Sequence, residues 1–237
     1  MTSTLEDPVW WRPFASVGIA SVTYVRLSPD SECEAAALAW LDSPEHARRA
    51  RFRHAGARRQ FVLCRAALRA MLRERLGCGN DQLSFDASQR GKPFALVNGV
   101  PAPIGFSVSH SGRHGLIAVA PTGRVGIDVE DRAARADLDA VAAMTFAPVE
   151  RAELAAASGG RRTDLFFTIW TTKEALTKAL GVGLSKDLRR LEIPRAMRRG
   201  AKRAVLRLPD LPTETWQLEN LETPDFAAAI ATELNSD

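Results

Sequence analysis

The chain has 237 residues, enough to bury a sizeable core as one large domain or two small ones. Hydrophobic residues make up 46% of it and charged residues 25%, as in ordinary globular proteins, and no apolar run approaches the roughly 20 residues that span a membrane. The net charge of +4 favours an anionic partner, whether nucleic acid, a phosphorylated small molecule or an acidic protein. Three cysteines without metal-ligand spacing, and an N-terminus without a signal-peptide pattern, predict a mature cytoplasmic protein.

Hydrophobic periodicity and turn residues predict short strands and helices along the whole chain. In chain order these are a strand over 14–27, helices over 31–41, from Ser43 onward and over 58–76, a turn at 91–93, strands over 104–108, 115–120 and 124–130, helices near 135–144, 148–157 and 164–180, and strands over 204–208, 215–221 and 226–231. Pro121-Thr122-Gly123 predicts a hairpin between the strands on either side of it.

The segment from His46 to Arg59 holds six arginines and two histidines, which suits either an anionic ligand or a solvated helix face. In the helix that follows, Phe61, Leu68 and Leu72 form an apolar stripe. Along its flank lie three arginines at the same spacing, Arg58, Arg65 and Arg69. They could lay their stems over the core or clamp a phosphate.

Carboxylates stand two residues apart on the strand GIDVE at residues 126–130. Asp128 and Glu130 therefore point to one face of the strand, and Glu174 on a later helix could supply a third carboxylate. Oxygen ligands without Cys or His suit Mg²⁺ or Mn²⁺. Gly126 shares this face, and we expect it to leave room for a bulky ligand.

The helix over 164–180 has two unlike faces. One is the apolar face expected of a core helix, formed by Leu165, Ile169, Leu176 and Leu180. The other carries Phe167, Trp170, Glu174 and Lys178. Glu174 and Lys178 could form only an ordinary ion pair one turn apart. Because two aromatic residues share their face, we favour a covered site.

Four motifs, GKP at 91–93, SHSG at 109–112, GIDVE at 126–130 and WTTKEALTK at 170–178, resemble those of the 4′-phosphopantetheinyl transferase superfamily. The length is similar to that of its larger, surfactin-synthetase-activating (Sfp-type) branch. The resemblance implies a monomeric α+β fold of two similar lobes, residues 1–120 and 121–237, each a small antiparallel sheet packed with helices. A pseudo-twofold axis would relate the lobes, and the active site would lie between them.

The resemblance also implies an activity. Such an enzyme transfers the 4′-phosphopantetheine arm of coenzyme A to a serine of an apo acyl or peptidyl carrier protein, and releases 3′,5′-ADP. Asp128, Glu130 and Glu174 resemble its Mg²⁺ ligands. Glu174, Lys178 and Glu150 resemble its catalytic residues, with Glu150 as the base for the carrier serine. The residues expected to contact coenzyme A are Arg51, Arg58, Arg65, Lys92, Pro93, Ser109, His110, Asp128, Lys173 and Lys178.

Two other functions compete with this one. A basic nucleic-acid-binding protein would use the arginines of 46–75, but the carboxylates would repel its phosphate backbone and no aromatic residues are interleaved for base stacking. A Mg²⁺-dependent nucleotide hydrolase is the other alternative, although the chain has no GxxxxGK[ST] phosphate loop. We therefore expect coenzyme A and an acidic carrier as partners, with neither nucleic acid nor a membrane. The identity of the carrier stays open.

Overall fold

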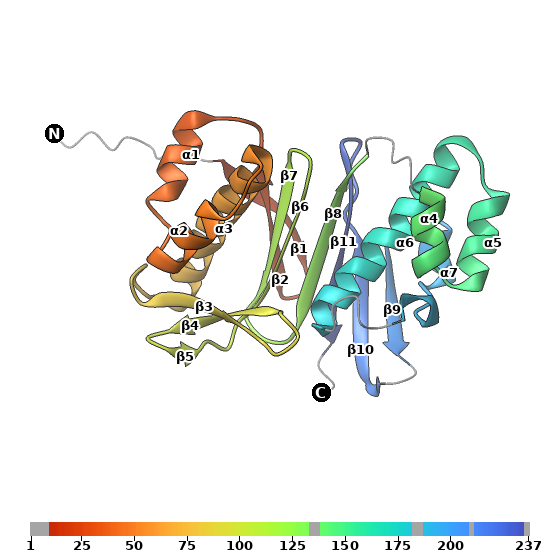
Figure 1. Cartoon of the computed structure of the whole chain (residues 1–237). Coiled ribbons are helices and arrows are strands. Elements are labelled where there is room, and N and C mark those ends of the chain that lie inside the picture. The colour runs from red at the N-terminus through yellow and green to blue at the C-terminus, as the bar shows by residue number, and fades with distance from the viewer. Residues whose placement is uncertain (1–9, 133–137, 182–186, 209–210, 235–237) are drawn as a thin grey trace.

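The computed structural model describes residues 10–132, 138–181, 187–208 and 211–234. Within these ranges the chain forms two lobes that lie side by side (Figure 1). The elements are β1 Trp11–Val17, β2 Ala20–Arg26, α1 Ser31–Leu38, α2 Ser43–Ala50, α3 Ala55–Leu76, β3 Leu83–Ala87, β4 Pro93–Val97, β5 Val100–Pro101, β6 Gly105–Ser111, β7 His114–Ala120, β8 Val125–Asp131, α4 Leu138–Thr145, α5 Pro148–Ala156, α6 Gly159–Leu180, the 3₁₀ helix η2 Leu188–Arg190, α7 Arg195–Arg198, β9 Arg203–Leu208, β10 Leu211–Asn220 and β11 Phe226–Leu234.

Each lobe is built from one antiparallel four-stranded sheet and one long helix. The N-terminal sheet has the order β1-β2-β7-β6, and the C-terminal sheet has the order β8-β11-β10-β9. The helices α3 and α6 have 22 residues each, and each ends at a glycine with left-handed backbone, Gly77 and Gly181. A small third sheet, β3-β4-β5, extends from the N-terminal lobe.

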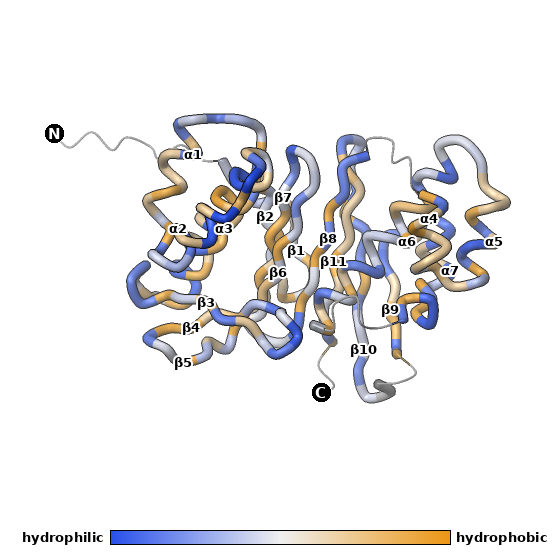
Figure 2. The backbone as a smooth tube through the Cα atoms, viewed as in Figure 1, coloured by the Kyte–Doolittle hydropathy of each residue, from blue (hydrophilic) through white to orange (hydrophobic). Residues whose placement is uncertain are grey.

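The lobes are stacked helix, sheet, sheet, helix. The inner faces of the two sheets bury a shared apolar cluster, to which the N-terminal sheet contributes Leu116 and Ala118 and the C-terminal sheet Ile127, Val129 and Ile230. Orange, hydrophobic stretches mark β7, β8 and β11 along this contact (Figure 2). The outer faces are covered by α3 and α6, over two further clusters. This arrangement confirms the predicted α+β fold of two lobes with small antiparallel sheets.

Two predictions of local structure were wrong. The stretch 14–27 is not one strand, because Gly18, with a left-handed φ of 55°, turns the chain between β1 and β2. The strands β7 and β8 do not form the predicted hairpin either. The partners of β7 are β2 and β6, whereas β8 pairs with β11, so Pro121-Thr122-Gly123 carries the chain from one sheet to the other.

The role expected of Gly126 also needs correction. A Cβ atom there would lie 2.0 Å from the carbonyl oxygen of Ala175 and 2.3 Å from the backbone nitrogen of Ala179. The glycine therefore makes room for the backbone of α6, which rests directly on β8, and leaves no space for a ligand. Among the described residues, none of the helices combines the length and the apolar character needed to cross a bilayer.

Gly126→Ala should force α6 away from β8. Overpacking of this kind costs about 1–3 kcal/mol of unfolding free energy, and more where backbone is in the way. Urea denaturation would measure this loss. Gly56→Ala is the control, since nothing lies within 4 Å of a Cβ atom there and alanine favours a helix. Equal stability of the two variants would contradict the close contact.

Candidate active site

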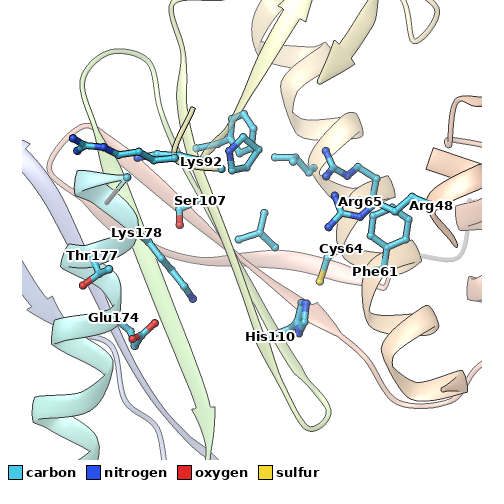
Figure 3. Close-up of a pocket in the computed structure, with 17 residues that line it drawn as sticks. Arg48, Phe61, Cys64, Arg65, Lys92, Ser107, His110, Glu174, Thr177 and Lys178 are labelled. Atoms are coloured by element: carbon cyan, nitrogen blue, oxygen red, sulfur yellow. The ribbon is translucent and has the colours of Figure 1, made fainter. Parts of the chain in front are cut away.

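A pocket of about 350 Å³ opens between the two lobes. Figure 3 shows the α3 side with Phe61 and Arg65, and the α6 side with Glu174 and Lys178. The lining residues are Arg48, Phe61, Cys64, Arg65, Leu68, Arg90, Gly91, Lys92, Pro93, Phe106, Ser107, Val108, His110, Glu174, Thr177, Lys178 and Gly181. The pocket therefore combines an apolar floor with charged walls, and its size is that of a small-molecule site.

On the C-terminal wall, Lys178 pairs with Asp128. The Lys178 Nζ lies 2.7 Å from Asp128 Oδ1 and also donates to the Ser109 hydroxyl at 2.8 Å. Ser109 in turn donates to Asp128 Oδ1 at 2.9 Å. The second oxygen, Asp128 Oδ2, is buried and has no hydrogen-bond partner. Burial raises the pKa of Asp128 although Lys178 opposes the shift.

Glu174 lies between Lys178 and Trp170 on the same helix face, one turn from each. Its Oε1 atom is buried without a hydrogen-bond partner. The pKa of Glu174 is raised, first by burial and then by the neighbouring Asp128 carboxylate, with Lys178 acting against the shift. Carboxylates crowded in this way favour either protons or a cation.

Glu130 follows Asp128 on the same face of β8 and accepts hydrogen bonds from two directions. Trp170 Nε1 donates to Glu130 Oε1 at 2.8 Å, and the Ser111 hydroxyl donates to Glu130 Oε2 at 2.9 Å. The Trp170 side chain therefore packs against the strand as well as belonging to the helix face singled out from the sequence.

These carboxylates fit a hard divalent cation by chemistry. Asp128 and Glu174 each offer a buried oxygen that has no other partner, and oxygen donors are what Mg²⁺ prefers. In the part of the chain that the structure describes, no three His, Cys, Asp or Glu side chains already stand close enough to hold a metal ion. Lys178 supplies the positive charge beside Asp128 instead.

On the opposite wall, Arg65 offers a free edge of its guanidinium group. The Arg65 Nε lies 3.4 Å from Glu45 Oε1, and the group lies 4.2 Å from the ring centre of Phe85. Its Nη1 atom is buried without a hydrogen-bond partner. Arg48 lies beside Arg65 over the same Phe61 ring, and Arg90 also lines the pocket. An anion with several charged oxygens would find complementary donors here.

Lys92 joins the two lobes at the end of the pocket. Its Nζ donates to the carbonyl oxygens of Ala179, at 2.8 Å, and Val125, at 3.2 Å. The carbonyl of Ala179 belongs to the last turn of α6, whose carbonyl groups lack partners within the helix. Burial lowers the pKa of Lys92 to about 8, and Arg124 adds to this shift.

His110 lines the pocket from β6. The pKa of His110 is lowered, first by burial and also by the positive charge of Lys178. This shift favours the neutral ring, which can donate one hydrogen bond and accept another.

Comparison with known proteins identifies the family. A model of the 4′-phosphopantetheinyl transferase superfamily matches residues 124–231, and a model of the N-terminal part of 4′-phosphopantetheinyl transferases matches residues 27–122. The 4′-phosphopantetheinyl transferase HetI of Nostoc sp. is 37% identical over 165 residues, which cover 70% of this chain and 69% of that protein. The chain belongs to the 4′-phosphopantetheinyl transferase superfamily.

Two further relatives support this family. The 4′-phosphopantetheinyl transferase psf-1 of Bacillus pumilus is 31% identical over 77% of this chain and 74% of its own length. A putative 4′-phosphopantetheinyl transferase of Synechocystis sp. is 37% identical over 63% of this chain and 61% of its own length. The family and the class of enzyme predicted from the sequence are thus confirmed.

The structure places Glu150 and Lys173 together in the C-terminal lobe, away from the pocket lining. Both side chains are fully buried, and their charged atoms lie 2.8 Å apart. Glu150 also accepts the backbone N–H groups of Ala147 and Ile193, while Lys173 donates to carbonyl groups that include that of Leu188. Neither lines the pocket. The pair therefore fixes the core of the C-terminal lobe.

The arginines of the N-terminal lobe divide differently from the sequence expectation. Arg51 and Arg58 are exposed and lie outside the pocket lining. Arg69 is fully buried, where it binds Asp42, Glu45 and the carbonyl oxygen of Leu83.

The sequence analysis did not single out the two other arginines of the pocket wall. Arg48 lies three residues after Glu45, whose capping box with Asp42 starts α2. This spacing could have indicated that Arg48 lies on the same face of α2 as Glu45, because residues three apart share one helix face. Arg90 precedes the GKP turn and lines the pocket from there.

Lys173→Met should destabilise the fold strongly, because it leaves the Glu150 carboxylate buried without its cation. Breaking a buried pair in this way costs about 3–5 kcal/mol. Thermal unfolding would measure the loss, and Glu150→Gln should also unfold earlier while the folded fraction keeps its turnover. A loss of about 10²–10⁴-fold in kcat for Glu150→Gln at unchanged stability would instead support Glu150 as the base for the carrier serine.

Proposed function

We propose that this chain transfers the 4′-phosphopantetheine arm of coenzyme A to a serine hydroxyl of an apo acyl or peptidyl carrier protein and releases 3′,5′-ADP. One observation carries the proposal. The pocket between the lobes is lined by Arg65, whose Nη1 atom has no partner, and by Glu174, whose buried Oε1 atom has none either, with the unpartnered Oδ2 atom of Asp128 beside Lys178. A ligand with separate phosphate groups and an apolar part suits such a pocket. The family provides the type of reaction.

Coenzyme A would lie across the pocket with its phosphate groups toward the cationic side chains. Arg65, with its unpartnered Nη1, and the adjacent Arg48 suit the isolated 3′-phosphate. Lys178, beside Asp128, and His110, which is close enough to Lys178 to feel its charge, suit the diphosphate. Lys92 is engaged with two carbonyl groups, so its contribution is chiefly to hold the lobes around the ligand.

Mg²⁺, or Mn²⁺ in its place, would be held by Asp128 and Glu174 through their unpartnered oxygens, together with Glu130. When bound, the cation would neutralise charge on the diphosphate and on the departing 3′,5′-ADP. The protein's share is to keep the three carboxylates on one wall and to release Lys178 from Asp128 toward a phosphate.

The transfer breaks the bond between the phosphopantetheine phosphorus and the oxygen of 3′,5′-ADP, and forms a bond from that phosphorus to the serine oxygen. The serine proton needs an acceptor. Glu174 suits this role better than Glu150, because Glu174 lines the pocket whereas Glu150 is fully buried against Lys173. Lys178 adds positive charge as the phosphoryl group passes, as transfers of this type require.

An acidic carrier would suit a chain of net charge +4, since opposite charges speed encounter. We keep the expectation of a monomer and of a cytoplasmic enzyme as part of this proposal. Nucleic-acid binding is the weaker alternative, because the buried carboxylates that line the pocket would repel a phosphate backbone.

Intact-mass spectrometry of apo carrier proteins incubated with the full chain, coenzyme A and Mg²⁺ tests the reaction. We expect the carrier to gain the mass of one phosphopantetheine group, and a carrier lacking its serine to gain nothing. Removing Mg²⁺ with a chelator, or changing Glu174 to Gln, should abolish the gain. Persistent transfer under both conditions would refute the cation, and absent transfer with every type of carrier would refute the function.

Arg65→Ala should raise the KM for coenzyme A by about 10- to 100-fold, the value of one hydrogen bond to a charged group. The KM for dephospho-coenzyme A, which lacks the 3′-phosphate, should barely change. Steady-state kinetics with both substrates would separate the effects. Arg58→Ala is the matched control, because Arg58 is an exposed arginine on the same helix outside the pocket. Equal losses for both substrates would remove Arg65 from the 3′-phosphate.

A further inference from the structure

Every second residue in the second half of β6 is a serine whose side chain bonds to β8. We call these three residues the serine seam: Ser107, Ser109 and Ser111. Ser107 accepts the backbone N–H of Ile127 at 3.1 Å, and Ser109 accepts that of Val129 at 3.3 Å. Ser111 donates to the carboxylate of Glu130 at 2.9 Å. The serine seam therefore joins β6 to β8 from Ile127 to Glu130.

The serine side chains join β6 and β8 where backbone hydrogen bonds would join two strands of one sheet. β6 is an edge strand of the N-terminal sheet and β8 an edge strand of the C-terminal sheet. Within the described residues, no hydrogen bond between backbone atoms joins these two strands. Serine hydroxyl groups instead satisfy donors of one edge that would otherwise be buried without partners. They join the lobes without merging the sheets.

The three serines differ in what they hold. Ser107 bonds to β8 through a backbone N–H group alone, as far as the described contacts extend. Ser109 and Ser111 donate to the carboxylates of Asp128 and Glu130. At Glu130, Ser111 binds one oxygen and Trp170 the other, so the carboxylate is oriented from both lobes at once. A purely mechanical seam would need no donors aimed at carboxylates.

We propose that Ser111 and Trp170 are positioning residues that fix the Glu130 carboxylate for binding a divalent cation, so that the N-terminal lobe sets the cation affinity of carboxylates carried by the C-terminal lobe. The inference rests on the proposed function, and it concerns side chains beyond the cation's own ligands. Donors that orient ligating carboxylates change metal affinity by about 10- to 100-fold when they are removed.

The geometry explains why both donors are needed. Glu130 follows Val129 near the end of β8, and its side chain is only partly buried. A glutamate has three rotatable bonds, and fixing them costs conformational entropy each time the cation binds. Two hydrogen bonds to opposite oxygens, one from each lobe, select the orientation before the ligand arrives.

Mn²⁺ binding to the full chain, followed by electron paramagnetic resonance in the presence of coenzyme A, tests the inference. Ser111→Ala should weaken Mn²⁺ binding by about 10- to 100-fold. Ser111→Thr keeps a hydroxyl and should restore the affinity, whereas Trp170→Phe removes the other donor and should weaken it as well. Ser107→Ala is the matched control, because it breaks the seam at a backbone N–H and should keep the Mn²⁺ affinity.

The outcomes are distinguishable. Wild-type Mn²⁺ affinity in Ser111→Ala overturns the inference while carrier modification by the wild type stands. An equal loss of affinity in Ser107→Ala also overturns it, because the seam would then act only through lobe docking. If Ser111→Ala fails to fold, the affinity of Trp170→Phe decides. A wild-type chain that modifies carriers without binding Mn²⁺ overturns the inference and the cation, but leaves the transfer intact.

Discussion

The direct contact of α6 with β8 at Gly126 is the constraint on which the site depends. Only a residue without a side chain lets the helix backbone approach this strand so closely. Lys178 and Trp170 are eight residues apart, a rise of about 12 Å along a helix, whereas Asp128 and Glu130 are about 6.7 Å apart along the strand. The long side chains of Lys178 and Trp170 therefore converge from one face of α6 on two neighbouring carboxylates of β8, Asp128 and Glu130.

From this contact follows the unequal charge of the pocket walls. The C-terminal wall gathers three carboxylates around one lysine, and the raised pKa values of Asp128 and Glu174 reflect their burial in that setting. On the N-terminal wall, the carboxylate of Glu45 lies between the guanidinium groups of Arg65 and Arg69. The N–H groups of Arg69 donate to Asp42 and to the carbonyl oxygen of Leu83, whereas the Nη1 atom of Arg65 has no hydrogen-bond partner. Such opposed walls give an asymmetric polyphosphate one preferred direction.

The sequence was most informative where the chemistry is local. Alternation along a strand put Asp128 and Glu130 on one face, and helical spacing aligned Trp170, Glu174 and Lys178, as the structure has them. The fold class came from the family motifs. What failed depended on tertiary contacts. Whether a charged side chain faces solvent, a pocket or a partner in the core is decided by packing, so nothing in the local pattern separated buried Lys173 from Lys178.

The same limit explains the wrong hairpin. A Pro-Thr-Gly turn between two apolar strands suits a hairpin locally. In the structure, however, β7 pairs with the preceding strand β6 and with the distant β2, whereas β8 pairs with the distant β11. The sequence also predicted that the missing side chain of Gly126 leaves room for another group. Only the structure shows that this group is the backbone of α6.

Side chains of the N-terminal lobe bind and orient groups of the C-terminal lobe at or near the pocket. Lys92 from the N-terminal lobe binds a carbonyl group at the end of α6, and the serine seam binds the carboxylates of β8. The lobes share a buried apolar cluster that provides most of their attraction, since burial of apolar surface dominates association. The polar links across the lobes add comparatively little stability, because each exchanges water for a protein partner. Their value lies in geometry, so that a substitution at these links should impair the site before it loosens the fold.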